Sequence, residues 1–280
     1  MPNSFWYLSL VFISLIVFIL VYIKSNHFRK DLAVYIFAAG LSFFGEVIVL
    51  ILFQAYDYYP HFLKEHWSDN IVGALISQGF IIPIALMAIG AFQLREKWVI
   101  LIIFVIILIE ELFLRLGIYE HNWWLTWYTF GLLLFASYIM KWWRRKLNNP
   151  SIWMQFITIY MLFTIILHTI TFFLSAVLKL SWYSMDLFES IYKDHTILKT
   201  MINIILTIPL TAIVLFSYKY VTLIALFIFT VIFNTVLIKL GILYVIDFKV
   251  VIVIAFIHLF IVFIVKRFND YLFPGEKDFV

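Results

Sequence analysis

The sequence contains no cysteine and few charged residues, and both shortages exclude classes of protein. Without cysteine, the chain of 280 residues cannot be a secreted scaffold held together by disulfides. Only 13% of its residues are charged, against about 25% in an ordinary soluble domain. This low charge content is inconsistent with a soluble globular enzyme and with a disordered chain.

Hydrophobic residues, by contrast, make up 65% of the chain. A membrane-spanning helix requires roughly 20 mostly apolar residues, so nine such helices would use about 180 residues. The composition therefore predicts an all-α, polytopic transmembrane helical bundle and excludes a porin-like barrel. The net charge of +4 is explained by basic loops at one membrane face. We expect the lipid bilayer as partner and no nucleic acid.

Apolar runs separated by polar breaks predict nine membrane spans. They cover residues 5–23, 32–55, 71–93, 98–118, 123–141, 152–176, 198–217, 220–240 and 248–265. The first run is as long as a signal peptide, but it lacks a basic start and a small-residue cleavage site. Basic residues also follow it directly. We therefore expect a retained transmembrane helix with its N-terminus outside.

The distribution of charge between the breaks predicts the orientation. Basic residues gather after the first, third, fifth, seventh and ninth spans, as Lys24, Arg29, Lys30, Arg95, Lys97, Lys141, Arg144, Arg145, Lys146, Lys219, Lys266 and Arg267. Because basic loops stay on the cytoplasmic side, the C-terminus is expected there. Heavy use of Ile, Phe, Leu, Lys and Asn indicates an AT-rich bacterial genome, and hence a bacterial plasma membrane.

Tyr and Trp residues gather at the ends of the predicted spans. Those at the outer ends are Tyr56, Tyr58, Tyr59, Trp67, Tyr119, Trp123, Trp124, Trp182 and Tyr183. Amphipathic rings favour the headgroup layer of a bilayer. We interpret these residues as an interfacial belt, with stacking on a ligand as the alternative.

The chain also resembles itself at a distance of about half its length. The aligned features are residues 112–118 with 236–242, Pro83 with Pro209, and Asp69-Asn70 with Asp194-His195. We expect a four-span repeat A at 31–147 and a four-span repeat B at 148–268. A separate transmembrane helix at 1–30 and a cytoplasmic tail at 269–280 complete the chain. Four spans per repeat predict a parallel rather than an inverted duplication; chance similarity between apolar segments is the alternative.

Ionisable groups at membrane depth are costly, so each is a candidate site. The principal candidates for binding an ion or a substrate are Glu46, Gln78, Glu110, Glu111 and Arg115. All fall in the outer half of the predicted spans, where they would line an outward-facing polar cavity for a cation, a proton or a substrate amine. Glu111 and Arg115 are four residues apart and could neutralise each other in one helix. The alternative for Glu46 and Glu110 is hydrogen bonding that holds helices together.

Secondary candidates lie near the outer face and in repeat B. They are Asp69, His121, His168, Asn234, Lys239 and His258. Repeat B lacks the acids of repeat A, and its histidines are equally explained as helix contacts. No histidine pair has the spacing of a zinc motif, and no nucleotide-binding or nucleophile motif occurs. We therefore expect no metal, no cofactor and no catalytic residue.

One further pattern consists of Tyr59-Pro60-His61-Phe62, Asp69, Pro83, Ile109-Glu110, Gly117 and Trp124-Leu125-Thr126-Trp127-Tyr128-Thr129-Phe130. In this pattern the sequence resembles an uncharacterised family of small multi-pass membrane proteins of Bacillus- and Clostridium-type bacteria. The resemblance covers residues 31–147 and implies a Gram-positive plasma-membrane protein. It implies no activity. Repeat B departs from the pattern at the position of Glu110 and in the Trp-rich stretch.

These features favour binding or passage of a small cation or small polar solute through the polar cavity. Two alternatives stay open. One is a non-catalytic accessory or scaffold subunit of a bacterial envelope or sporulation complex. The other is an intramembrane enzyme that modifies a lipid, which would need two facing carboxylates. The sequence also leaves open whether the chain associates with another membrane protein or with copies of itself.

Overall fold

The computed structural model describes residues 1–274 and divides the chain into two compact units. Unit 1 is Met1–Ser151 and unit 2 begins at Ile152. The division falls close to the boundary expected after residue 147. The predicted tail begins inside a helix that runs to Leu272, and its residues 275–280 lie outside the described part of the chain.

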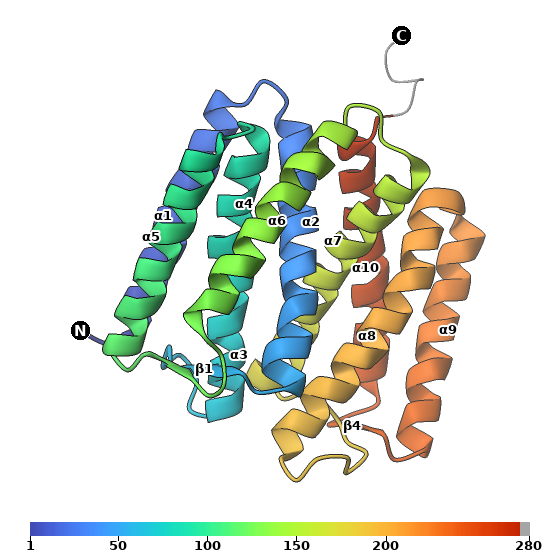
Figure 1. Ribbon diagram of the computed structural model, residues 1–280. Helices are drawn as coiled ribbons and strands as arrows, with labels where there is room; N and C mark the ends of the chain where they lie inside the picture. The colour runs from blue at the N-terminus through green and yellow to red at the C-terminus, as the bar shows by residue number, and fades with distance from the viewer. Residues whose placement is uncertain (275–280) are drawn as a thin grey trace. The chain divides into compact units, whose positions relative to one another are not determined.

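Unit 1 contains five helical rods and two short strands (Figure 1). Its elements are α1 (Asn3–Lys24), α2 (Phe28–Glu46), η1 (Val47–Leu52), β1 (Tyr56–Tyr58), α3 (His66–Ile76), η2 (Ser77–Ile81), α4 (Ile82–Ala91), α5 (Glu96–Arg115), β2 (Tyr119–His121) and α6 (Thr126–Lys146). The η elements are π-helical turns. Element η1 continues α2 as one rod, and η2 joins α3 to α4 as another.

Unit 2 contains four helical rods and again two short strands. Its elements are α7 (Ile152–Phe172), η3 (Phe173–Val177), β3 (Ser181–Tyr183), α8 (Ile191–Phe216), α9 (Tyr220–Lys239), β4 (Leu243–Val245) and α10 (Lys249–Leu272). Here η3 prolongs α7. Every predicted span therefore coincides with a helical rod, whereas the four strands, each of three residues, were not expected.

Seven rods among residues 1–274 are long and apolar enough to cross a membrane. They are Asn3–Lys24, Phe28–Leu52, His66–Ala91, Ile152–Val177, Ile191–Phe216, Tyr220–Lys239 and Lys249–Leu272. The other two, α5 and α6, have comparable lengths of 20 and 21 residues. However, α5 carries charged residues near both ends, and α6 ends in a strongly basic turn. The chain is a multi-pass, all-α membrane protein.

Helix α4 lies at the centre of unit 1, where it packs against α1, α2 and α6. A Cβ atom on Gly90 would come within 3.3 Å of the Met140 carbonyl oxygen and of a Val34 methyl group. The absent side chain therefore allows α4 to approach α2 and α6 closely, as small residues do between membrane helices. At the same end of the bundle, Phe37 of α2 stacks on Trp143 of α6 with ring centroids 3.9 Å apart.

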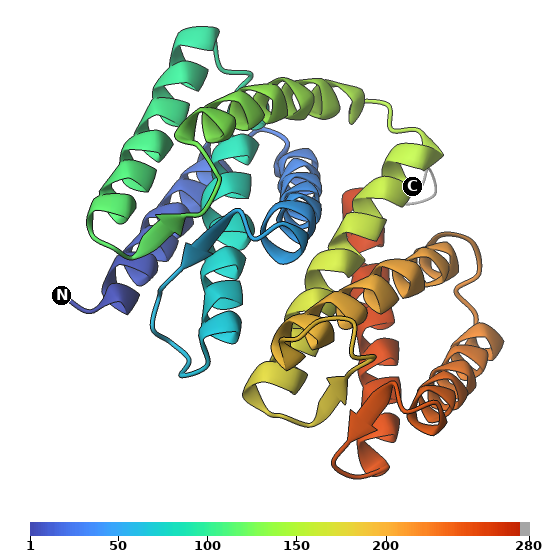
Figure 2. The same cartoon turned by 60° about the horizontal axis from the view of Figure 1, so that its bottom comes forward.

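The strands form one antiparallel pair in each unit, visible at the ends of the helices in Figure 2. In unit 1, Tyr56 pairs with His121 and Tyr58 with Tyr119. In unit 2, Ser181 pairs with Val245 and Tyr183 with Leu243. The second strand of each pair follows a glycine, Gly117 or Gly241, with φ of 66° or 71°. This left-handed conformation ends the helix and favours glycine.

A carboxylate organises the loop after the first strand of each pair. In unit 1, Asp69 accepts backbone N–H groups of His61, Phe62 and Leu63 at 2.7–2.9 Å. The neighbouring Asn70 accepts the N–H of Tyr58.

Unit 2 repeats both interactions with its own residues. Asp194 accepts the N–H groups of Met185, Asp186 and Leu187, and His195 Nδ1 accepts the N–H of Tyr183. These loops therefore have the same hydrogen-bonding plan.

A proline interrupts the rod formed by α3, η2 and α4. Pro83 has no N–H to donate to the carbonyl of Gly79, four residues earlier. The Tyr35 hydroxyl of α2 instead donates to that carbonyl at 2.7 Å. The irregular backbone at η2 is thus satisfied by a neighbouring helix, as membrane depth requires.

Candidate functional site

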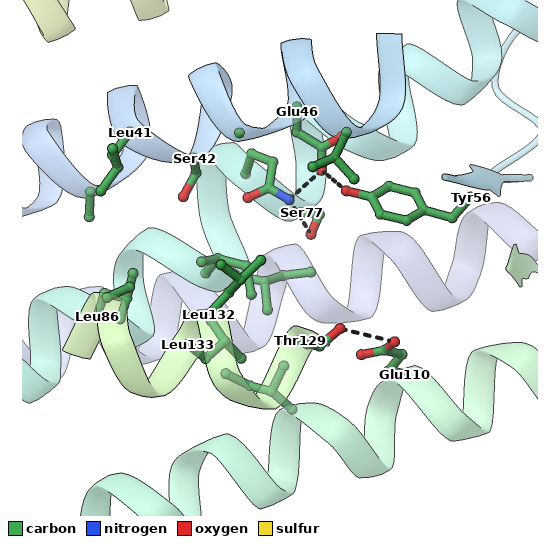
Figure 3. A pocket seen from close by; sticks show the side chains of 18 of the residues that line it. Leu41, Ser42, Glu46, Tyr56, Ser77, Leu86, Glu110, Thr129, Leu132 and Leu133 are labelled. Carbon is green, nitrogen blue, oxygen red and sulfur yellow. Dashed lines mark hydrogen bonds between the residues drawn. The ribbon is translucent and has the colours of Figure 1, made fainter. Parts of the chain in front are cut away.

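A pocket of about 450 Å³ lies inside unit 1, between α1, α2, α4, α5 and α6 (Figure 3). Most of its wall is apolar. The aliphatic and phenyl side chains include Leu10, Leu41, Phe44, Ile48, Val49, Ile81, Ile82, Leu86, Ile106, Ile109, Phe113, Leu132, Leu133, Phe135 and Ile139. Both π-helical turns of unit 1 contribute, and such turns are frequent at functional sites.

Glu46 is the central polar residue of the pocket. Its side chain is at the end of α2, directly before η1, and only 6% of the residue is exposed. The Tyr56 hydroxyl donates to Glu46 Oε1 at 2.9 Å, and Gln78 Nε2 of η2 donates to the same oxygen. The second oxygen, Oε2, is fully buried, and the Tyr58 side chain is a further polar neighbour of this carboxyl group. Glu46 is thus held by tyrosine and glutamine side chains at the wall of the pocket.

Glu110 lines the other side of the same pocket. Figure 3 shows it with Thr129, across from Glu46 and Tyr56. Its Oε1 accepts the Thr129 hydroxyl at 3.1 Å and lies 2.9 Å from His121 Nε2. Burial lowers the pKa of His121, although the nearby Glu111 carboxylate opposes this effect. The His121 imidazole thus joins β2 to Glu110 on α5.

Five aromatic side chains close the pocket at the sheet. They are Tyr7, Tyr56, Tyr58, Tyr119 and Trp124, and each is at most 9% exposed. Burial raises the pKa of Tyr56, Tyr58 and Tyr119 well above the ordinary value, so these hydroxyls keep their protons. The prediction of an interfacial belt is wrong for Tyr56, Tyr58, Tyr119 and Trp124. Contacts between the strands and helices bury rings that local sequence places at a membrane surface.

The principal candidates from the sequence separate into two groups. Glu46, Gln78 and Glu110 line one pocket. Glu111 instead accepts the Thr126 hydroxyl at 2.8 Å, and Arg115 is exposed at the end of α5. No ion pair joins Glu111 to Arg115 among the described residues. The pocket is also less polar than expected, and its aromatic end is closed.

Among the secondary candidates, Asp69 organises a loop and His121 contacts Glu110, as described above. The others belong to unit 2. His168, Asn234 and His258 are buried and bond to carbonyl oxygens four residues earlier in their own helices. Lys239 is exposed at the end of α9. These interactions match the alternative interpretation of polar residues that serve helix structure.

Sequence reasoning missed Lys199, which is buried in α8 with 5% exposure. Its ammonium lies 5.5 Å from the centroid of the Phe172 ring. A lysine inside an apolar helix is a recognisable signal. It was overlooked because it falls near the start of the predicted span, where lysine side chains ordinarily reach the membrane surface.

The arrangement can bind one polar group within an apolar cavity. Glu46 and Glu110 supply carboxyl groups at its wall, while the surrounding aliphatic side chains accommodate a carbon skeleton. No group of three or more His, Cys, Asp or Glu residues with the geometry of a metal site occurs in the described chain. Comparison with models of known families, with curated proteins and with solved structures finds no match for this sequence.

Proposed function

We propose that unit 1 binds a small organic molecule carrying a protonated amine, with the ammonium group at Glu46. The placement of two carboxyl side chains, Glu46 and Glu110, on opposite sides of one mostly apolar pocket carries the proposal. An ammonium group bound at Glu46 would supply both a hydrogen-bond donor and a compensating charge. Pockets for small molecules typically combine apolar walls with a few polar groups, and this one has that composition.

Two features favour binding over a purely structural role for the intramembrane acids. Glu46 and Glu110 border the same cavity from opposite sides. The cavity volume of about 450 Å³ is also in the range of small-molecule sites. These observations support binding over the scaffold alternative, and passage of the ligand across the membrane is a further step of the same proposal.

The proposal extends to the organisation of the chain in its membrane. We propose nine spans, including α5 and α6, and an N-terminus outside a bacterial plasma membrane. We also propose that the units descend from one four-helix ancestor, which resembles the family of small membrane proteins. Three equivalences 125 residues apart support the duplication: Asp69 with Asp194, Asn70 with His195, and Tyr58 with Tyr183.

Glu46→Gln tests the binding proposal. The amide keeps the size of the side chain but removes its charge, so it should weaken binding of hexylamine to the purified protein in detergent. A hydrogen bond to a charged group contributes about 1.5–3 kcal/mol, which corresponds to about tenfold to a hundredfold in affinity. Isothermal titration calorimetry measures the change, with hexanol as the uncharged ligand of equal chain length.

Glu120→Gln is the matched control, because Glu120 is exposed on β2 and does not line the pocket. It should bind hexylamine as the unaltered protein does. Equal affinity for hexylamine in the Glu46→Gln variant would refute the proposal, as would equal affinity of the unaltered protein for hexylamine and hexanol.

A further inference from the structure

We propose that the ligand is an amphiphilic amine that dissolves in the membrane and reaches Glu46 sideways, between α2–η1 and α6. This inference rests on the proposed function, because it specifies the class of amine and its route. It depends on which sides of the pocket are closed and which side is open.

The end of the pocket at the sheet is closed by packed aromatic rings. Tyr58 and Tyr119 stack with centroids 4.9 Å apart, and Tyr56 contacts both of them and Trp124 at 5.3–5.5 Å. Tyr7 completes the cluster, because its ring contacts that of Tyr58 with centroids 6.4 Å apart. Its hydroxyl donates to the Ile118 carbonyl at 2.7 Å. A solute arriving from water at this end would have to displace the cluster.

Tight helix packing closes the opposite end. There the stacked rings of Phe37 and Trp143 join α2 to α6, and Trp143 is only 4% exposed. Gly90 brings α4 against both helices at this level. The pocket therefore has no wide opening along the helix axes.

Within unit 1, the sides of α2–η1 and α6 that face the pocket are instead open between these two ends. The lining residues Ile48, Leu132 and Phe135 are 52%, 54% and 64% exposed. Gly45 also lines the pocket, and a Cβ atom added to it would meet nothing within 4 Å. We call the opening bordered by these four residues the lateral gap.

The lateral gap lies at the depth of the membrane. Gly45 and Ile48 belong to the apolar rod Phe28–Leu52, which is long enough to span the hydrocarbon layer. Every side chain at the gap is apolar, so a strongly hydrated solute gains no interaction there. An alkyl chain, by contrast, is stabilised at the gap, because its burial in an apolar environment is favourable. The ammonium group then finds its acceptor at Glu46, one residue from Gly45.

The class of ligand is tested first, with the protein in lipid vesicles. An octylamine that carries a photoreactive diazirine at its chain end labels the site, and butylamine, hexylamine and octylamine compete with it. Affinity referred to the aqueous concentration should rise about fourfold for each added methylene. Ethanolamine should compete at least a hundredfold more weakly than octylamine. Competition by ethanolamine equal to that of octylamine would contradict the inference.

The route is tested by filling the gap with Gly45→Trp. The indole ring has open space to occupy and should reduce octylamine labelling at least tenfold. Gly131→Trp is the matched control, because Gly131 also faces open space on α6 but does not line the pocket. It should label as the unaltered protein does. If Gly45→Trp does not fold, Leu132→Trp blocks the gap from the other side with the same expected result.

The outcomes separate the inference from the proposed function. Normal labelling of a folded gap variant, together with lost hexylamine binding in Glu46→Gln, would overturn the lateral route and leave the binding site intact. Unchanged binding in Glu46→Gln would overturn the binding site itself. Reduced labelling in the gap variant with normal labelling in Gly131→Trp supports the route.

Discussion

At the scale of single residues, two carboxylates of unit 1 show how the same chemical group serves different roles. Both Asp69 oxygens accept backbone N–H groups, so the side chain is fully used in shaping a loop. Glu46 instead accepts only side-chain donors, at one oxygen, and borders a cavity. Hydrogen-bond accounting, rather than burial alone, therefore distinguishes a structural acid from a candidate binding residue.

Replacement of the loop carboxylates should destabilise each unit without altering the pocket. In Asp69→Asn, one oxygen that accepts backbone N–H groups becomes an amide donor, and buried donors lose their acceptor. We expect a loss of about 1–3 kcal/mol. Asp194→Asn should have a similar effect in unit 2. Thermal unfolding in detergent measures both, and an unchanged unfolding temperature in either variant would contradict the structural role.

At the scale of elements, apolar runs predicted the helices well, because the length of a span and its lack of charge are local properties. Every predicted span coincides with a rod. The short strands and the π-helical turns were not predictable, since they depend on pairing between distant segments. Glu46, Gln78 and Glu110 could be assigned to one cavity from their similar depth. The contact of His121 with Glu110 could not, because it requires β2 to fold back over α5.

The interrupted rod of α3, η2 and α4 offers a test at this scale. Tyr35→Phe removes the donor to the Gly79 carbonyl, which Pro83 cannot replace. We expect a loss of about 1 kcal/mol or more. In the double variant Tyr35→Phe with Pro83→Ala, the restored N–H can bond to the carbonyl, so the cost of Tyr35→Phe should fall. A thermal-unfolding cycle of the four proteins measures the coupling, and strictly additive effects would contradict it.

At the scale of the whole molecule, the sequence and the structure agree on a multi-pass membrane protein in two units. The charge distribution becomes regular only over the full chain, because basic residues recur after every second rod in both units. Each unit ends its helices at a two-stranded sheet, with the same loop interactions. The polar residues within the helical rods nevertheless differ, with Glu46 and Glu110 in unit 1 and Lys199 in unit 2. If the units are copies, as proposed, the copy formed by unit 1 carries the pocket lined by Glu46 and Glu110.

The absence of native cysteine allows the proposed topology to be tested with single reporters. Cysteine is introduced at the exposed positions Lys64, Glu189, Asn149 and Lys219, one per variant. In intact bacterial cells, a membrane-impermeant maleimide should label positions 64 and 189, while positions 149 and 219 should react only after the membrane is opened. Labelling of 64 and 149 from the same side would contradict the nine-span topology.

The central claim is that an amine binds at the Glu46 carboxyl group. Infrared difference spectroscopy of the protein in vesicles, with and without hexylamine, tests it most directly because carboxyl groups have their own vibrational bands. We predict a ligand-induced change in the carboxyl bands that is absent in Glu46→Gln and retained in Glu120→Gln. The same carboxyl difference bands in Glu46→Gln as in the unaltered protein would contradict the claim.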